Sequence, residues 1–131
     1  MATYQKLQQV GPDHLDELNH VNNVQYLAWV QDVSKEHWMA RATPKMLQEY
    51  IWVVREHRIT YHGAAIEGDT IRITTHIIGS KGPISTRKVV MEDNKTGRLL
   101  VSSETDWCLL SPTTMKPVKM PDAISQLFET R

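Results

Sequence analysis

The chain has 131 residues, and its 15 lysine and arginine residues balance 15 aspartate and glutamate residues, so its formal net charge is zero. Zero net charge removes the broad attraction by which nucleic-acid and membrane-surface binders collect polyanions, so neither partner is expected. No apolar run approaches the roughly 18 residues that span a bilayer. A chain of this length can bury one sizeable core, and we expect one globular domain over residues 1–131.

Cys108 is the only cysteine, so no intramolecular disulfide can form. The N-terminus lacks the basic segment and apolar core of a signal peptide, and a reducing cytoplasm is the expected location. Apolar neighbours favour a small buried side chain at Cys108. A catalytic thiolate would need a nearby histidine or helix N-terminus, which the sequence does not show.

The first part of the chain predicts one strand and two helices. Residues 4–10 alternate weakly between apolar and polar and predict a strand, which a glycine and a proline end. Residues from about 22 to 42 predict a long amphipathic helix, because apolar residues recur at the spacing of one helical face. These residues are Tyr26, Val30, Val33 and His37. Thr43 before a proline resembles a helix N-cap and predicts a short helix over 44–50.

The rest of the chain predicts four strands and a last helix. Runs rich in β-branched and aromatic residues predict strands at about 51–62, 70–79, 84–92 and 99–109. Turn-forming clusters that contain glycine separate consecutive runs, which predicts a largely antiparallel meander. Residues 121–129 predict the final helix. The pattern indicates an α+β fold in which an antiparallel sheet wraps around the long helix.

The stretch from Gly11 to Tyr26 carries more polar groups than any other part of the chain. It contains Asp13, His14, Asp16, Glu17, Asn19, His20, Asn22 and Asn23. One interpretation is structural, with an asparagine as N-cap and acidic residues that complement the helix dipole. One cap satisfies a helix, however, and this loop holds many more polar side chains. We therefore also consider it as the candidate active site.

Residues 16–26, DELNHVNNVQY, resemble the helix-start motif of the hotdog-fold thioesterases. This family includes the 4-hydroxybenzoyl-CoA thioesterase-like enzymes and the acyl-ACP thioesterases, with the pattern Asp-x-Asp-x-x-Gly-His-Val-Asn-Asn-x-x-Tyr. The order of predicted elements agrees, and the resemblance covers about residues 4–120. It implies a hotdog fold, hydrolysis of acyl-CoA or acyl-ACP thioesters without a cofactor, and a homodimer or homotetramer.

The sequence departs from the family pattern at two positions. Asn19 stands where the family has glycine, which is compatible because asparagine also adopts left-handed backbone conformations. His14 stands where the family has its first aspartate, with Asp13 one residue earlier. The second aspartate of the family pattern corresponds to Asp16 in this sequence, and the histidine of the pattern corresponds to His20. The resemblance therefore implies Asp16 as the catalytic carboxylate, with Asp13 in reserve.

Thioester hydrolysis needs an activated water or a nucleophile, and donors that stabilise the developing oxyanion. We expect Asp16 to act as base or nucleophile and backbone N–H groups of residues 21–23 to form the oxyanion hole. His20 either orients Asp16 or the water, or only satisfies a backbone carbonyl. Asn22, Asn23 and Val24 are expected beside the substrate, although the two asparagines also suit a structural role.

Several other residues are weaker candidates. Lys81, Arg87 and Lys88 could meet the phosphates of coenzyme A, or could be ordinary surface charges. Tyr26 and Trp29 could line an acyl pocket between subunits, or belong to the core.

Glu36 could supply a second carboxylate, although solvent exposure or pairing with a nearby charge is favoured. The strand histidines lack ligand spacing, and no metal site is expected. A non-catalytic acyl-thioester binding protein is the alternative function.

Overall fold

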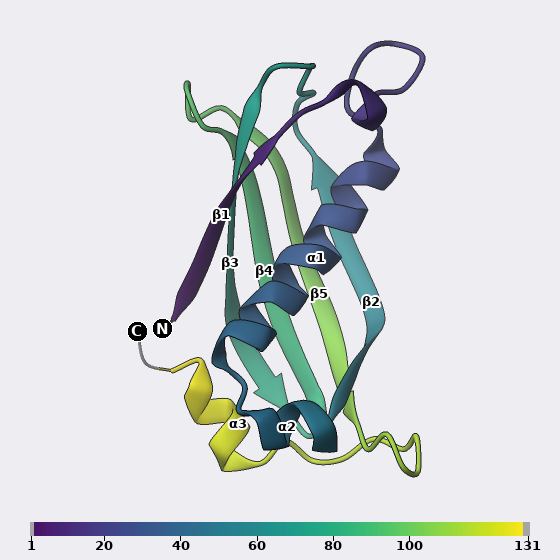
Figure 1. Cartoon of the computed structure of the whole chain (residues 1–131), viewed down its shortest axis with the longest axis vertical. Coiled ribbons are helices and arrows are strands. Elements are labelled where there is room, and N and C mark those ends of the chain that lie inside the picture. The colour runs from purple at the N-terminus through teal and green to yellow at the C-terminus, as the bar shows by residue number, and fades with distance from the viewer. Residues whose placement is uncertain (1, 130–131) are drawn as a thin grey trace.

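The structure, a computed structural model, describes residues 2–129 and contains one antiparallel sheet with a long helix across one face (Figure 1). The elements in chain order are β1 (Thr3–Gln9), a 3-10 turn η1 (Pro12–His14), α1 (Asn23–Arg41), α2 (Pro44–Glu49), β2 (Ile51–Tyr61), β3 (Thr70–Lys81), β4 (Ile84–Asp93), β5 (Leu99–Leu110) and α3 (Asp122–Leu127). All predicted helices and strands are present, with ends displaced by at most two residues. The predicted α+β class is confirmed.

The strand order is β1-β3-β4-β5-β2, with every neighbouring pair antiparallel. The predicted meander is confirmed only for β3, β4 and β5. β2 pairs with β5, with Ile51 opposite Leu110, and β1 pairs with β3. The expected hairpin between β2 and β3 is therefore wrong, since these strands lie three positions apart in the sheet.

The connection between β2 and β3 passes over the start of α1. The Ala65 amide donates to Tyr26 Oη at 3.0 Å, and the Val21 amide donates to the Ala65 carbonyl at 2.9 Å. Gly68 supplies the turn with a φ of 94°. Turn-forming residues occur whether or not the two flanking strands pair with each other. The turn between β2 and β3 therefore could not distinguish a hairpin from a longer connection.

The core lies between α1 and the inner face of the sheet. The predicted helical face is confirmed, because Tyr26, Val30, Val33 and His37 are all buried. Strand β4 buries alternate residues, which places Ser85, Arg87, Val89 and Met91 on the inner face.

β2 is a free edge of the sheet and carries partly exposed apolar side chains, with Val53 39% and Tyr61 40% exposed. Val24 and Met39 on α1 are also exposed. Cys108 is buried and free, as predicted. Across residues 2–129, no helix is long and apolar enough to cross a membrane.

Candidate active site

The approach loop, residues 11–22, doubles back on itself before α1. Leu15 and Val21 form an isolated antiparallel bridge, and the Asp16 amide donates to the His20 carbonyl at 2.8 Å. Asn19 makes the tight turn with a φ of 62°. Asparagine tolerates this left-handed conformation better than most residues, which confirms that it can replace the family's glycine.

Asp16 is held by the backbone of its own loop. Its Oδ1 accepts hydrogen bonds from the amides of Leu18 at 2.8 Å and His20 at 3.2 Å. Within residues 2–129, Oδ2 has no hydrogen-bond donor. One carboxylate oxygen is thus fixed while the other is available to a water molecule or a substrate.

The two histidines of the loop differ in their surroundings. His14 Nδ1 accepts from the Gly11 amide at 2.9 Å, and its ring meets Trp29 edge-on with centroids 5.0 Å apart. His14 therefore has a structural role at the position of the family's first aspartate. His20 is exposed, and its imidazole has no hydrogen-bond partner in the described part of the chain. Its contact with Asp16 is through the backbone. Asp13 is exposed on η1.

Asn22 is the N-cap of α1, since its Oδ1 accepts from the Val24 amide at 2.9 Å. The structural interpretation of Asn22 is confirmed. The Val21 and Asn22 amides donate to the carbonyls of Ala65 and His14, each at 2.9 Å. Of the three amides expected in the oxyanion hole, only that of Asn23 has no acceptor among residues 2–129. The candidate donor is therefore Asn23.

Tyr26 and Trp29 are both buried, and their rings pack against each other with centroids 5.9 Å apart. Neither borders the cavity at the other end of α1 that is described below. The structure supports the core interpretation. Glu36 pairs with Lys6 at 2.7 Å, as the favoured alternative predicted.

The three basic residues expected to act together do not all share a surface. Lys81 is exposed at the end of β3, whereas Arg87 is only 5% exposed and faces α1. Lys88 follows Arg87 in β4 and therefore faces the opposite side of the sheet. The expectation that Arg87 meets surface-bound phosphates is wrong.

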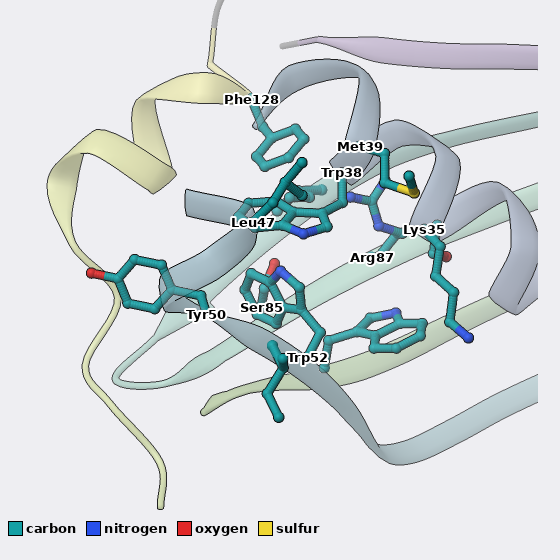
Figure 2. Close-up of a pocket in the computed structure, with 13 residues that line it drawn as sticks. Lys35, Trp38, Met39, Leu47, Tyr50, Trp52, Ser85, Arg87 and Phe128 are labelled. Carbon is teal, nitrogen blue, oxygen red and sulfur yellow. The ribbon is translucent and has the colours of Figure 1, made fainter. Parts of the chain in front are cut away.

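A cavity of about 420 Å³ lies at the other end of α1, between the helix, β2 and α3, and we call it the tryptophan cavity. Its walls include Trp38, Trp52, Trp107 and Phe128. Figure 2 shows Trp38, Leu47 and Phe128 on one side and Trp52 on the other. The sequence pattern did not indicate that Trp38, Trp52 and Trp107 would meet. Their convergence depends on the fold, because they lie on α1, β2 and β5.

Arg87 lies at the floor of the tryptophan cavity beside His37 of α1. Its Nη1 donates to His37 Nδ1 at 2.8 Å and to Thr75 Oγ1 at 3.2 Å. Burial lowers the pKa of Arg87 to about 10, so the guanidinium remains charged at neutral pH. Burial, followed by the charges of Arg87 and Arg41, lowers the pKa of His37 to about 4. His37 is therefore neutral at neutral pH.

No group of three or more histidine, cysteine or acidic side chains able to hold a metal ion occurs in residues 2–129.

The five-stranded antiparallel sheet with one long helix is the hotdog fold of thioesterases. The chain belongs to the thioesterase-like superfamily, which its sequence matches over residues 10–128. It is 29% identical over 85 residues to the chloroplastic acyl-[acyl-carrier-protein] hydrolase FATB3 of Cuphea viscosissima, covering 64% of this chain and 21% of that protein. The chain thus spans about a fifth of the length of the curated relatives it matches.

Two solved structures illustrate the similarity of fold. YbaW, a probable thioesterase from Escherichia coli, is 20% identical with a TM-score of 0.85, covering 95% of this chain and 96% of that chain. A thioesterase from Thermus thermophilus, in complex with coenzyme A and Zn, is 20% identical with a TM-score of 0.83, covering 96% of this chain and 97% of that chain.

Proposed function

We propose that this chain hydrolyses acyl-CoA or acyl-ACP thioesters to a free acid and a thiol. The observation that carries the proposal is Asp16, whose Oδ1 is fixed by two loop amides while Oδ2 lacks a donor among residues 2–129. The loop leads directly into α1, where the helix N-terminus carries positive partial charge. Family membership and relatives that are thioesterases support the same activity.

In the proposed reaction, Asp16 Oδ2 takes a proton from a water molecule whose oxygen attacks the thioester carbonyl carbon. The Asn23 amide donates to the oxyanion that forms, an interaction worth about 2.7 to 4 kcal/mol in other enzymes. The C–S bond then breaks, and the leaving thiolate takes the proton from the Asp16 carboxyl group. Direct attack by Asp16 on the carbonyl is the alternative with the same residue. Asp13 remains the reserve carboxylate.

The active unit is proposed to be a homodimer, or a homotetramer built from such dimers, formed through the free edge of β2. Antiparallel pairing of two copies of β2 about a twofold axis would set the Ile51 end of one strand against the Tyr61 end of the other. The Ile51 end lines the tryptophan cavity. The Tyr61 end contacts the start of α1, since Tyr61 Oη donates to the Asn23 carbonyl at 3.4 Å. Each cavity would then face the partner's approach loop.

Lys81 and Lys88 are the remaining candidates for contacts with the phosphates of coenzyme A. A thioesterase from Thermus thermophilus and a Staphylococcus aureus protein were both solved with coenzyme A, which supports this substrate class. The chloroplastic relatives are named as acyl-ACP hydrolases or thioesterases, which supports acyl-ACP as the alternative substrate class. A cytoplasmic location, as expected from the single buried thiol Cys108, completes the proposal.

A screen of acyl-CoA chain lengths and aryl-CoAs, read out by thiol release, tests the proposal. We expect release from at least one series, with turnover that depends on Asp16. Tight binding of acyl-CoA without thiol release from any of them would contradict hydrolysis. That outcome would favour the alternative, a non-catalytic acyl-thioester binding protein, for which His14 at the position of the family's first aspartate is the supporting observation.

A further inference from the structure

We propose that the tryptophan cavity receives the acyl part of the thioester, and that Arg87 at its floor pairs with a carboxylate at the far end of that acyl group. The preferred substrates would then be monothioesters of dicarboxylic acids. This inference rests on the proposed function and specifies its substrate class.

The first argument is that Arg87 is a buried cation without a counterion. Across residues 2–129, no carboxylate lies within ion-pair distance of Arg87. Only Nη1 is engaged, with His37 and Thr75, while Nε and Nη2 have no acceptor in the same range. An unpaired buried charge is strongly unfavourable, so such charges are normally paired. An anion in the cavity would supply the missing partner.

The second argument is an excess of buried donors beside Arg87. His37 Nδ1 accepts from Arg87, which leaves the ring proton of the neutral imidazole on Nε2. This Nε2 is buried and has no partner within residues 2–129. Trp107 Nε1 is also buried and has no hydrogen-bond partner among residues 2–129. Trp107 is 6% exposed and lines the cavity. Buried donors are normally satisfied, so the region lacks acceptor oxygens.

The position of Trp107 connects these donors. In the β4–β5 pairing, Trp107 lies opposite Ser85, and Arg87 lies opposite Thr105. Ser85 and Arg87 are two residues apart on one face of β4, so Trp107 is a neighbour on the same inner face. A carboxylate, with two acceptor oxygens, has the right chemistry to serve both the guanidinium and an indole N–H.

The third argument is the apolar character of the walls of the tryptophan cavity. Trp38, Trp52 and Phe128 make the approach to Arg87 mostly apolar (Figure 2), and Ile77 also lines the cavity. Phe128 also covers the guanidinium, with its ring centroid 5.5 Å from Arg87 Cζ. The volume of about 420 Å³ lies in the usual range of ligand pockets. An apolar chain with a single anionic end fits such a cavity, whereas a strongly hydrated phosphate would lose its water against apolar walls.

The test compares CoA thioesters of matched length, suberyl against octanoyl and sebacyl against decanoyl. We expect the wild-type kcat/KM to favour the dicarboxylic thioester by at least about tenfold, as for a buried charge pair. Arg87→Met should reverse the preference, and Arg87→Lys should keep part of it. Arg72→Met is the matched control, because Arg72 lies on β3 and pairs with Glu92 at 3.1 Å, outside the cavity. Thermal melting establishes that each variant is folded.

A second measurement does not depend on hydrolysis. In calorimetric titration, monomethyl sebacate should bind the wild type, while dimethyl sebacate and the Arg87→Met variant should show at least about tenfold weaker binding. If this difference appears but no thioester is hydrolysed, the carboxylate site stands and the proposed function fails.

Equal kcat/KM values for matched thioesters, together with equal binding of the two esters, would overturn the inference. Binding of plain decanoate that depends on Arg87, without a preference for dicarboxylic thioesters, would overturn the substrate assignment. The cavity would then hold a free fatty acid.

Discussion

Arg87 of β4 donates a hydrogen bond of 2.8 Å to His37 of α1, so a buried guanidinium and a neutral imidazole join the sheet to the helix. Both residues are almost fully buried, at 5% and 1% exposed. The contact links residues 50 positions apart in the sequence. It requires His37 to stay unprotonated, which makes the stability of the fold dependent on pH.

We predict that the free energy of unfolding falls as the pH decreases from about 6.5 towards 4. In the unfolded chain His37 takes up a proton near its ordinary pKa of 6.5, whereas in the folded chain its pKa is about 4. The unfolded state therefore binds more protons in this window, and stability is lost as the pH falls. A shift of this size corresponds to roughly 3 kcal/mol.

Urea unfolding at a series of pH values measures this dependence. Burial also lowers the pKa values of His57 and His76, so these residues contribute with the same sign. His37→Gln keeps an acceptor for Arg87 but does not titrate, and we expect it to flatten the curve. A variant with the same slope as the wild type would show that His37 is not responsible.

For catalysis, Asp16→Asn should lower thioester hydrolysis by about 100-fold or more, while folding and acyl-CoA binding persist. The asparagine Oδ1 can still accept the amides of Leu18 and His20, so only the base is removed. Asp13→Asn is the matched control and should change kcat/KM little. A larger loss in the Asp13 variant would move the catalytic role to that residue.

The role of His20 has its own test. His20→Ala should give a loss of hydrolysis smaller than that of Asp16→Asn if the exposed imidazole orients the water. The measurement is kcat/KM of His20→Ala and of the wild type, compared over the same pH profile. Unaltered rate and profile would assign His20 to its backbone contact with Asp16 alone.

Removal of the N-cap of α1 should destabilise the fold. Asn22→Ala leaves the Val24 amide without its 2.9 Å acceptor, and we expect a loss of about 1 kcal/mol in urea unfolding. Asn23→Ala is the control, since the Asn23 side chain makes no hydrogen bond within residues 2–129 and should change stability by less than about 0.5 kcal/mol. Equal losses in both variants would argue against a specific cap.

Lys81 and Lys88 should contribute to binding of coenzyme A rather than to chemistry. Changing both to methionine should raise KM for acyl-CoA several-fold and flatten its dependence on salt, with a similar kcat. Lys95→Met, in an exposed turn, provides the control. If KM does not change, both lysines are ordinary surface charges.

The proposed dimer predicts a specific effect at the β2 edge. Val53→Asp would place a carboxylate within the contact between the paired β2 strands, and sedimentation should show at least about tenfold weaker association. Leu7→Asp, on the opposite edge strand β1, should leave association unchanged. A wild-type chain that stays monomeric at micromolar concentration with full activity would refute the dimer.

The elements could be predicted from the sequence because their signals are local. The helical face of Tyr26, Val30, Val33 and His37, the proline after Thr43 and the glycine-rich turns each lie within a few residues of the structure they determine. The candidate loop was also found locally, since the motif from Asp16 to Tyr26 is one continuous string. Its internal hydrogen bonds join residues at most eight apart.

The tertiary structure alone decided which strands pair and which side chains meet. The turn at Gly68 indicates a reversal but not that β2 would cross to the far edge of the sheet. Arg87 and Lys88 looked equivalent as neighbouring cations, until the packing of α1 made one face of β4 the inner face. The buried donors of His37, Arg87 and Trp107 come from α1, β4 and β5. Contacts between distant segments arise from packing, and no local pattern encodes them.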